Sequence, residues 1–309
     1  MCPAFRFVPL LLALIASAGV VRAAESSAGS AIRHSYLVLG LKTAIIGEDG
    51  QAQWEYQGKS RDGFVLPNGN ALITWVDRVE EVTPAKEVVF KYERSRENGE
   101  LSTAQRLYNG NTLVTELGAR PRLIVVNSQG KVVQDVPLQP ETTNVHMQTR
   151  MARQLKNGNF LVPHLFAFAV KEYAPDGRVI QVIPTDLEEL GGRAAKNWPF
   201  TAIRLDNGNT LVSLTNGNKV VEFNPQGKIA WKVLNEQVNG QFKDPCGSQR
   251  LASGNTVVGS HGARTGISMI EVTPDHRIVW TSDHPLAAGV HHFQILTTNG
   301  QPEPGMPLK

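Results

Sequence analysis

The chain has 309 residues with a nearly balanced charge, since 31 lysines and arginines face 28 acidic side chains. This balance excludes the strongly basic surface that nucleic-acid binding requires and the polybasic patch of a membrane-surface protein. Hydrophobic residues make up 41% of the chain, which is enough for a globular domain with a large core.

The first 23 residues are typical of a secretory signal. Arg6 gives a positive start, residues 7–21 are apolar, and small residues surround Arg22 before a cleavage point. We therefore expect residues 1–23 to be a signal peptide, 24–35 a flexible N-terminal segment, and the mature protein to be periplasmic or secreted. Cys2 would leave with the signal, so Cys246 would have no disulfide partner. We expect no membrane span, because no later segment is long and apolar enough.

Two kinds of β-hairpin alternate along the rest of the chain. The first has a short apolar run, an Asn-Gly or Ser-Gly turn and a second apolar run, and its glycine permits the positive φ of a tight turn. The six copies of this first kind are 64–75, 105–116, 153–164, 203–214, 249–260 and 292–299. The six copies of the second kind are 44–56, 79–92, 123–136, 169–183, 220–233 and 268–281.

One hairpin of each kind makes a four-stranded antiparallel blade. The blades repeat about every 40 to 50 residues, a period typical of β-propellers. The chain opens with an unpartnered second hairpin and closes with an unpartnered first one. We therefore predict an all-β fold: a six-bladed β-propeller over 36–299, closed by pairing of the N- and C-terminal strands, with a Pro-rich tail at 300–309. An open β-solenoid or two sandwiches would not require this mismatch at the ends.

The longer loops are predicted to lie on one face of the propeller, where binding groups are usually found. Six of the eight histidines fall in or beside these loops, and imidazoles with guanidiniums around an axis favour an anion or a divalent metal. Any single loop histidine is more often an ordinary surface or capping residue. The candidate ligand-binding residues are Glu116, Arg120, Arg150, His164, Trp198 and His291. Trp54, Trp231 and Trp280 recur in the last strand of the second hairpin and are expected to pack one blade on the next.

The stretches 204–212 (RLDNGNTLV) and 221–231 (VEFNPQGKIAW) resemble the blades of the quinoprotein-like (PQQ-like) propeller superfamily. They are also similar to blades of bacterial arylsulfotransferases, which are exported six-bladed propellers. That resemblance implies a histidine nucleophile with supporting histidine and arginine side chains near the axis. The candidate catalytic residues are His146, His261, His292 and Arg264. A redox quinoprotein is not expected, because its adjacent cysteines and calcium-binding acid cluster have no counterpart here.

We therefore expect an exported propeller that binds a small anionic ligand or a protein partner on its long-loop face. The alternative is an arylsulfotransferase- or lyase-like enzyme with an axial His/Arg site. A metal-dependent hydrolase is the third reading, but clustered Asp and Glu are scarce, so no metal ligand is predicted. The sequence leaves the cofactor and enzymatic activity open, and we expect a monomer without a nucleic-acid partner.

Overall fold

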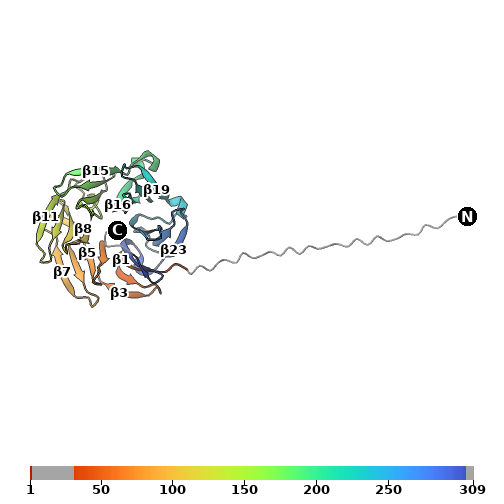
Figure 1. The fold of residues 1–309 in the computed structure, drawn as a ribbon, viewed down its shortest axis with the longest axis horizontal. Helices are drawn as coiled ribbons and strands as arrows, with labels where there is room; N and C mark the ends of the chain where they lie inside the picture. The colour runs from red at the N-terminus through yellow and green to blue at the C-terminus, as the bar shows by residue number, and fades with distance from the viewer. Residues whose placement is uncertain (2–30, 304–309) are drawn as a thin grey trace. The chain divides into compact units, whose positions relative to one another are not determined.

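The computed structural model describes residues 31–303 together with Met1. The predicted signal peptide, apart from Met1, and the end of the Pro-rich tail lie outside the described residues. The unit from Ile32 onward contains six antiparallel sheets that follow one another around a central axis (Figure 1). The predicted six-bladed β-propeller is confirmed. Within the described residues, no helix is long and apolar enough to cross a membrane.

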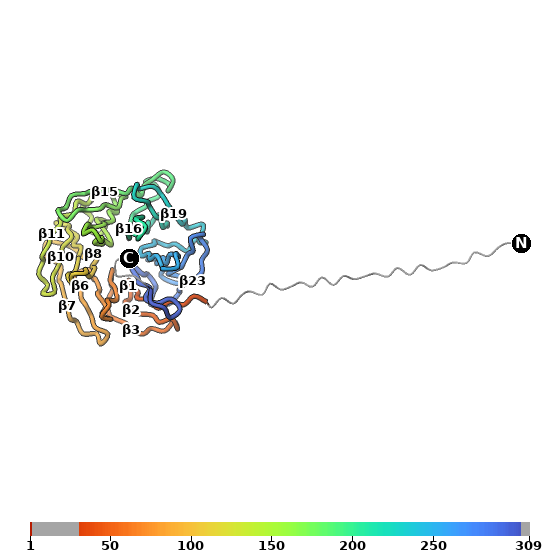
Figure 2. Tube along the Cα trace, viewed as in Figure 1, coloured from red at the N-terminus to blue at the C-terminus, as the bar shows by residue number. Residues whose placement is uncertain are grey.

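We number the blades 1 to 6 in chain order, and the Cα trace in Figure 2 can be followed through them. Blade 1 contains β4 (Asp62–Val65), β5 (Ala71–Thr74), β6 (Arg78–Val82) and β7 (Val88–Glu93). Blade 2 contains β8 (Asn98–Arg106), β9 (Thr112–Gly118), β10 (Arg122–Val126) and β11 (Val132–Pro137). Blade 3 contains β12 (Arg153–Gln154), β13 (Phe160–His164), β14 (Ala169–Tyr173) and β15 (Val179–Pro184).

Blade 4 contains β16 (Asn197–Arg204), β17 (Thr210–Asn216), β18 (Lys219–Phe223) and β19 (Ile229–Leu234). Blade 5 contains β20 (Pro245–Arg250), β21 (Thr256–Ser260), β22 (Met269–Val272) and β23 (Ile278–Ser282). Blade 6 contains β1 (His34–Gly40), β2 (Thr43–Ile46), β3 (Ala52–Tyr56), β24 (Val290–Thr298) and β25 (Gln301–Pro302). Five 3-10 turns lie in the loops between blades: Val145–Met147, Glu188–Leu190, Arg193–Ala195, Asn235–Val238 and Pro285–Ala287.

Blade 6 is where the ring closes. Its strand β24, from the end of the chain, pairs antiparallel with β1 from the start, and Leu39 lies opposite His292 in this register. Phe293 of β24 packs toward blade 5, where Gly247 and Gly259 leave space for its ring: a Cβ on either glycine would come within 3.1 Å of it. The predicted pairing of the two chain ends is therefore confirmed, and it removes the open edge that an unclosed sheet would present.

The Asn-Gly-Asn turns also connect neighbouring blades. Asn209, beside the turn of blade 4, donates to Glu222 on the third strand at 2.6 Å. The same carboxylate accepts a bond from Arg250, at the end of the first strand of blade 5, at 2.7 Å. The pairs Glu81–Arg106 and Glu172–Arg204 repeat this contact. Where the ring closes, His34 replaces the arginine and contacts Glu271 at 2.8 Å.

A second set of contacts joins the blades at the outer rim. Trp231 donates from its indole nitrogen to the carbonyl of Pro274 in the next blade at 2.9 Å, and Trp54 does the same to Pro84 at 3.2 Å. Gln181 takes the tryptophan position in blade 3 and donates to Pro225 at 2.7 Å. Trp280 packs its ring edge-to-face with Tyr36 of blade 6. The packing expected of the three tryptophans is therefore what the structure shows.

Candidate functional site

A ring of six side chains surrounds the propeller axis on the long-loop face, one from the innermost segment of each blade. These are Arg61, Glu100, Arg150, Phe200, Cys246 and His291. We call this set the mouth ring. Neighbouring members contact one another: Arg61 bonds to Glu100 at 2.7 Å, and Glu100 lies 3.8 Å from Arg150. The Arg150 guanidinium lies 5.7 Å from the Phe200 ring centre, and Phe200 also meets His291, two places further along the ring, edge-on at 5.6 Å. Cys246 packs in one buried cluster with Phe200. Side chains from six blades, spread over most of the chain, therefore form one site.

Glu100 is the one carboxylate of the mouth ring, and three basic side chains share it. Its oxygens contact Arg61 at 2.7 Å, His146 at 3.3 Å and Arg150 at 3.8 Å. Burial raises the pKa of this carboxyl, but the bonds from His146 and Arg61 and the charge of Arg150 outweigh it and lower the pKa to about 2. Glu100 is therefore ionised, and one negative charge faces two guanidiniums.

Arg150 is the buried cation of this group, with a side chain only 5% exposed. It donates to the carbonyl oxygens of Thr149 and His146. Burial lowers its pKa to about 10, the attraction of Glu100 opposes this, and the charge of Arg61 adds to the lowering. The positive charge of Arg150 is therefore only partly compensated by the protein, a condition that favours an anion in the mouth ring.

His261 and Arg264, in the loop between β21 and β22, cover His291. The Nδ1 of His261 donates to the carbonyl of Gly289 at 3.0 Å, and its Nε2 accepts from Arg264 at 2.9 Å. Both ring nitrogens are thus engaged, which holds the imidazole in its neutral form with the proton on Nδ1. The ring meets His291 edge-to-face, with centroids 3.9 Å apart. His261 is therefore placed to orient His291.

His291 lies partly exposed in the mouth ring. Burial of the ring, together with His261, Arg150, Arg61 and His146 around it, lowers its pKa well below the usual value. At neutral pH it is an uncharged imidazole, which can accept a proton or a hydrogen bond. His146 lies across the site in Val145–Met147, 60% exposed, with Nδ1 toward Glu100. The site thus combines the neutral imidazole of His291 with the imidazole of His146, which contacts the Glu100 carboxylate.

Below the mouth ring, a layer of buried polar side chains lies at the propeller axis. Arg153 of blade 3 forms two bonds of 2.8 Å with Asp62 of blade 1, and Thr103 of blade 2 bonds to both residues. His292 lies 3.6 Å from Asp62 and is 2% exposed. Burial lowers the pKa of His292 to about 4. His292 therefore faces this layer, on the other side of β24 from His291, and the structure does not bring it into the mouth ring.

The structure brings together five of the sequence-predicted residues: His146, Arg150, His261, Arg264 and His291. The others lie outside the mouth ring, and His292 is in the polar layer below it. Arg120 is exposed beside Asp135, and Trp198 packs on Phe166. Their predicted roles in binding receive no support from this arrangement.

Glu116 and His164 share one repeat position, six residues after a turn glycine, and are both buried in polar networks. Glu116 accepts bonds from Tyr92, Ser95 and Asn98, which overcome the effect of burial and lower its pKa to about 2, and it also pairs with Arg122 at 2.9 Å. His164 contacts Glu141 at 3.3 Å and Tyr173 at 2.9 Å. The Glu116 network joins blade 2 to Tyr92 of blade 1, whereas the His164 network joins two strands of blade 3 to Glu141 in the preceding loop.

Four members of the mouth ring, Arg61, Glu100, Phe200 and Cys246, were not predicted as site residues. A positional signal for three of them was present, because Arg61, Arg150, Phe200 and Cys246 each stand eight residues before a turn glycine. Glu100 and His291 depart from that spacing. The strand pairing of β8 shifts register between Leu101 and Thr103, and that of β24 shifts beside His292. Aligning the repeats on their turn glycines therefore finds four members of the mouth ring but not all six.

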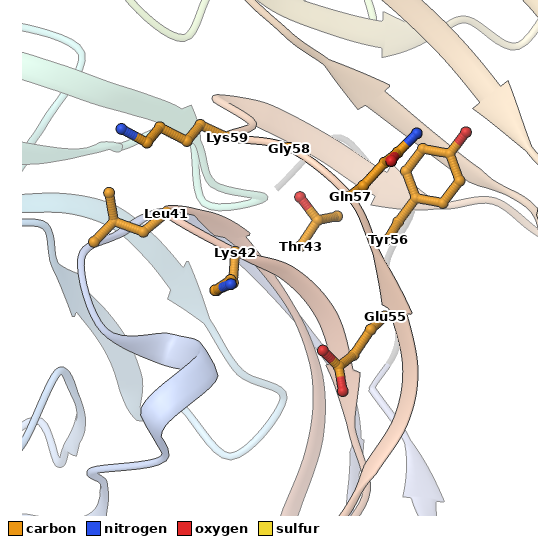
Figure 3. Close-up of a pocket in the computed structure, with 8 residues that line it drawn as sticks. All are labelled: Leu41, Lys42, Thr43, Glu55, Tyr56, Gln57, Gly58 and Lys59. Atoms are coloured by element: carbon orange, nitrogen blue, oxygen red, sulfur yellow. The ribbon is translucent and has the colours of Figure 1, made fainter.

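A hollow of about 440 Å³ opens on the same face, where β2 and β3 of blade 6 meet the loop leading to blade 1 (Figure 3). It is lined by Leu41, Lys42, Thr43, Glu55, Tyr56, Gln57, Gly58 and Lys59. Within residues 31–303, no group of three or more histidine, cysteine, aspartate or glutamate side chains is arranged to hold a metal ion. Burial raises the pKa of the Cys246 thiol to about 12, so this cysteine is an unreactive packing residue at neutral pH.

Comparison with solved structures supports the fold. A protein of unknown function from Bacteroides caccae has 22% identity and a TM-score of 0.73, and the match covers 84% of this chain and 98% of that one. A catalytically inactive virginiamycin B lyase from Staphylococcus aureus, solved with quinupristin, has 13% identity and a TM-score of 0.57, with 82% and 85% covered. A chain of a nidogen/laminin complex has 10% identity and a TM-score of 0.59, with 85% and 97% covered.

At these identities the three likenesses show the fold alone. Membership of the quinoprotein-like superfamily stays a prediction. A search of curated proteins gives no match. The model of the family described as Mal s 1 allergenic protein-like matches residues 41–265, which run from blade 6 into blade 5 and include five of the six mouth-ring residues. The chain belongs to the Mal s 1 allergenic protein-like family.

Proposed function

We propose that this protein binds a small anionic ligand in the mouth ring. The observation that carries the proposal is the pairing of one carboxylate, Glu100, with two arginines, of which Arg150 is buried. A buried cation whose charge is not fully balanced by carboxylates is stabilised more by a bound anion than a solvent-exposed cation is, because the dielectric constant around the buried cation is low. Arg264 adds a third guanidinium at the rim.

Thermal denaturation with added anions tests this proposal. Sulfate, phosphate, aryl sulfates and sugar acids are compared, and a ligand that binds only the folded state raises the Tm. We expect at least one of them to stabilise the unaltered chain, and the response to be lost in Arg150→Gln and in Arg61→Gln. The matched control is Arg178→Gln, which removes an exposed arginine on the short-turn face.

The control variant is expected to respond as the unaltered chain does. If no anion shifts the Tm, or if Arg150→Gln and Arg61→Gln respond as fully as the control, the proposal is wrong. Since Arg150→Gln changes a buried group, its folding is checked by circular dichroism before the comparison. Arg61→Gln provides the same test at a more exposed position.

A second candidate is a lyase-type enzyme that acts on such an anion. His291 offers a neutral imidazole beside two guanidiniums, and His146 offers a second imidazole that contacts Glu100. In an elimination, His291 would take the proton from the carbon next to an acidic group, and the electron pair of that C–H bond would form the double bond. The leaving group would depart with its bonding electrons and would receive a proton from His146. The arginines would stabilise the charge that develops on the acidic group.

The lyase neighbour supports this candidate by its fold and by its own chemistry, since it was made inactive by replacing one histidine with alanine. An arylsulfotransferase-type reaction would instead use His291 as the nucleophile. A substrate screen separates the two, because elimination creates a conjugated double bond that absorbs in the ultraviolet, whereas transfer from an aryl sulfate releases a phenol. His291→Ala should abolish either activity, and His276→Ala, on the opposite face, should not change it.

We also propose that the protein is exported, because its first 23 residues have the order of a secretory signal. Cell fractionation and the N-terminal sequence of the mature chain test this. Recovery of the full-length chain from the cytoplasm alone would contradict it.

A further inference from the structure

The hollow of about 440 Å³ on the long-loop face lies next to the mouth ring. Its lysines belong to two loops: Lys42 follows β1, and Lys59 precedes β4 (Figure 3). The lining includes one carboxylate, Glu55. Within the described residues, neither lysine lies within ion-pair distance of a carboxylate, whereas most arginines on this face have such a partner. With two lysines and one carboxylate, the hollow therefore carries a net positive charge.

The segment 59–61 joins the hollow to the mouth ring. Ser60 donates its backbone N–H to Gly40 at 3.0 Å, and Arg61 donates its own to Thr74 at 2.8 Å, so consecutive amides point to opposite sides as in an extended strand. The side chain of Ser60 turns inward and bonds to Thr43 at 2.7 Å. Lys59 and Arg61 therefore leave the backbone on the same side, with Cα atoms about 7 Å apart.

A second contact joins the two sites on the other side of the hollow. A Cβ on Gly289 would come within 2.9 Å of Leu41 and within 2.6 Å of the Arg264 guanidinium. Leu41, which lines the hollow, thus lies close to Arg264, which bonds to His261 above the mouth ring. In Figure 3, Lys59 extends on the side of Leu41, away from Tyr56. The hollow and the mouth ring are therefore neighbouring parts of one cationic surface.

We propose that the ligand of the mouth ring is elongated and that its second anionic group occupies this hollow, as in an acidic oligosaccharide. The inference rests on the proposed anion binding at the mouth ring. Apart from Leu41 and the ring of Tyr56, the lining offers two ammonium groups, one carboxylate, and amide and hydroxyl groups. The ammonium groups suit the carboxylates of a uronate chain, and the other polar groups suit its hydroxyls better than an apolar body. The spacing of Lys59 and Arg61 places cations along the path of such a chain.

Calorimetric titration with galacturonate and its dimer and trimer tests the inference. The monomer reports on the mouth ring alone, and the longer chains report on the hollow as well. Two exposed ion pairs contribute together about a tenfold gain in affinity, so the trimer should bind about ten times more tightly than the monomer. Lys42→Ala with Lys59→Ala should remove most of this gain and leave the affinity for the monomer unchanged.

The control is Lys131→Ala with Lys228→Ala, which removes the same charge from exposed turns on the opposite face and should keep the gain. If the monomer binds but the trimer binds no better, or if the hollow variant keeps the full gain, the inference is wrong and anion binding at the mouth ring stands. If neither galacturonate nor its trimer binds while sulfate or phosphate raises the Tm, the proposal that the ligand is a uronate is wrong. If no anion binds at all, the proposed function itself fails.

Discussion

Arg153 on β12 donates two hydrogen bonds to Asp62 on β4, each 2.8 Å long, across the axis of the propeller. The two residues are 91 positions apart and belong to blades 1 and 3, which are not neighbours. Both are buried, with Asp62 fully covered. Burial raises the pKa of the Asp62 carboxyl, but the charges of Arg153 and His292 outweigh it and leave the pKa below its usual range.

Removing one partner of this pair should be strongly destabilising. Asp62→Ala leaves the Arg153 guanidinium buried without its counter-charge, and we expect a loss of about 3 to 5 kcal/mol in the free energy of unfolding. The measurement is urea denaturation followed by fluorescence. Asp62→Leu combined with Arg153→Met should cost clearly less than the sum of the two single changes. Strictly additive losses would show that the pair does not act as a unit.

Glu100→Gln should change stability and binding in opposite directions. The variant leaves Arg150 buried without a carboxylate, so the free energy of unfolding should fall by about 2 to 4 kcal/mol. The mouth ring gains one net positive charge, so the affinity for sulfate should rise by about tenfold. Urea denaturation and calorimetric titration on the same preparation check both. An affinity that falls with the stability would contradict the electrostatic account of the site.

The stability of the folded protein should fall as the pH drops from about 6.5 to about 4. Burial lowers the pKa of His292 to about 4, although the neighbouring Asp62 opposes this, whereas an unfolded histidine titrates near 6.5. In this window the unfolded chain binds a proton that the folded chain does not, so the free energy of unfolding decreases with falling pH, by roughly 3 kcal/mol at its lower end.

The variant His292→Gln removes this titration and should make the pH dependence between 6.5 and 4 shallower. Urea denaturation at half-unit pH steps measures the slopes, with His276→Gln, in a turn on the opposite face, as the control. Parallel curves for the unaltered chain and His292→Gln would rule out His292 as a source of the acid sensitivity. Other histidines with lowered pKa values, such as His291 and His164, would still contribute.

Phe293 tests the closure of the ring. Its ring fills the space that Gly247 and Gly259 leave between blades 5 and 6, and the side chain is 2% exposed. Phe293→Ala should therefore cost about 3 to 5 kcal/mol, because a cavity forms where the last strand joins the first. Phe166→Ala, on a half-buried loop ring, should cost much less. A small effect of Phe293→Ala in thermal and urea denaturation would mean that closure depends little on this contact.

Much of the fold was predictable because blade construction is local. An Asn-Gly or Pro-x-Gly turn between apolar runs specifies a hairpin within a dozen residues, as in 203–214 and 220–233. The unmatched hairpins at the two ends then implied the pairing of β24 with β1, and the structure confirms it. The Asn, Glu and Arg positions that join neighbouring blades also repeat with the blade, as Asn209, Glu222 and Arg250 show.

The candidate site was only half predictable, because it depends on which side of a strand each residue faces at the axis. His291 and His292 are adjacent in the sequence, yet one reaches the mouth ring and the other faces Asp62 in the layer below. Successive side chains of a strand alternate in direction, and the register shift beside His292 sets which one faces the mouth. Glu116 and His164 share a repeat position, but both are buried in polar networks outside the mouth ring.

By itself, the sequence determined the blade, the number of blades and the face on which the long loops lie, because hairpin turns and apolar alternation act over short distances. Only the tertiary structure decided that Arg61 and Arg150 share the Glu100 carboxylate and that the His261 ring packs against His291. Those contacts join residues from different blades. Their distances depend on how the ring closes and where each inner strand shifts its register, and no local pattern in the chain encodes either quantity.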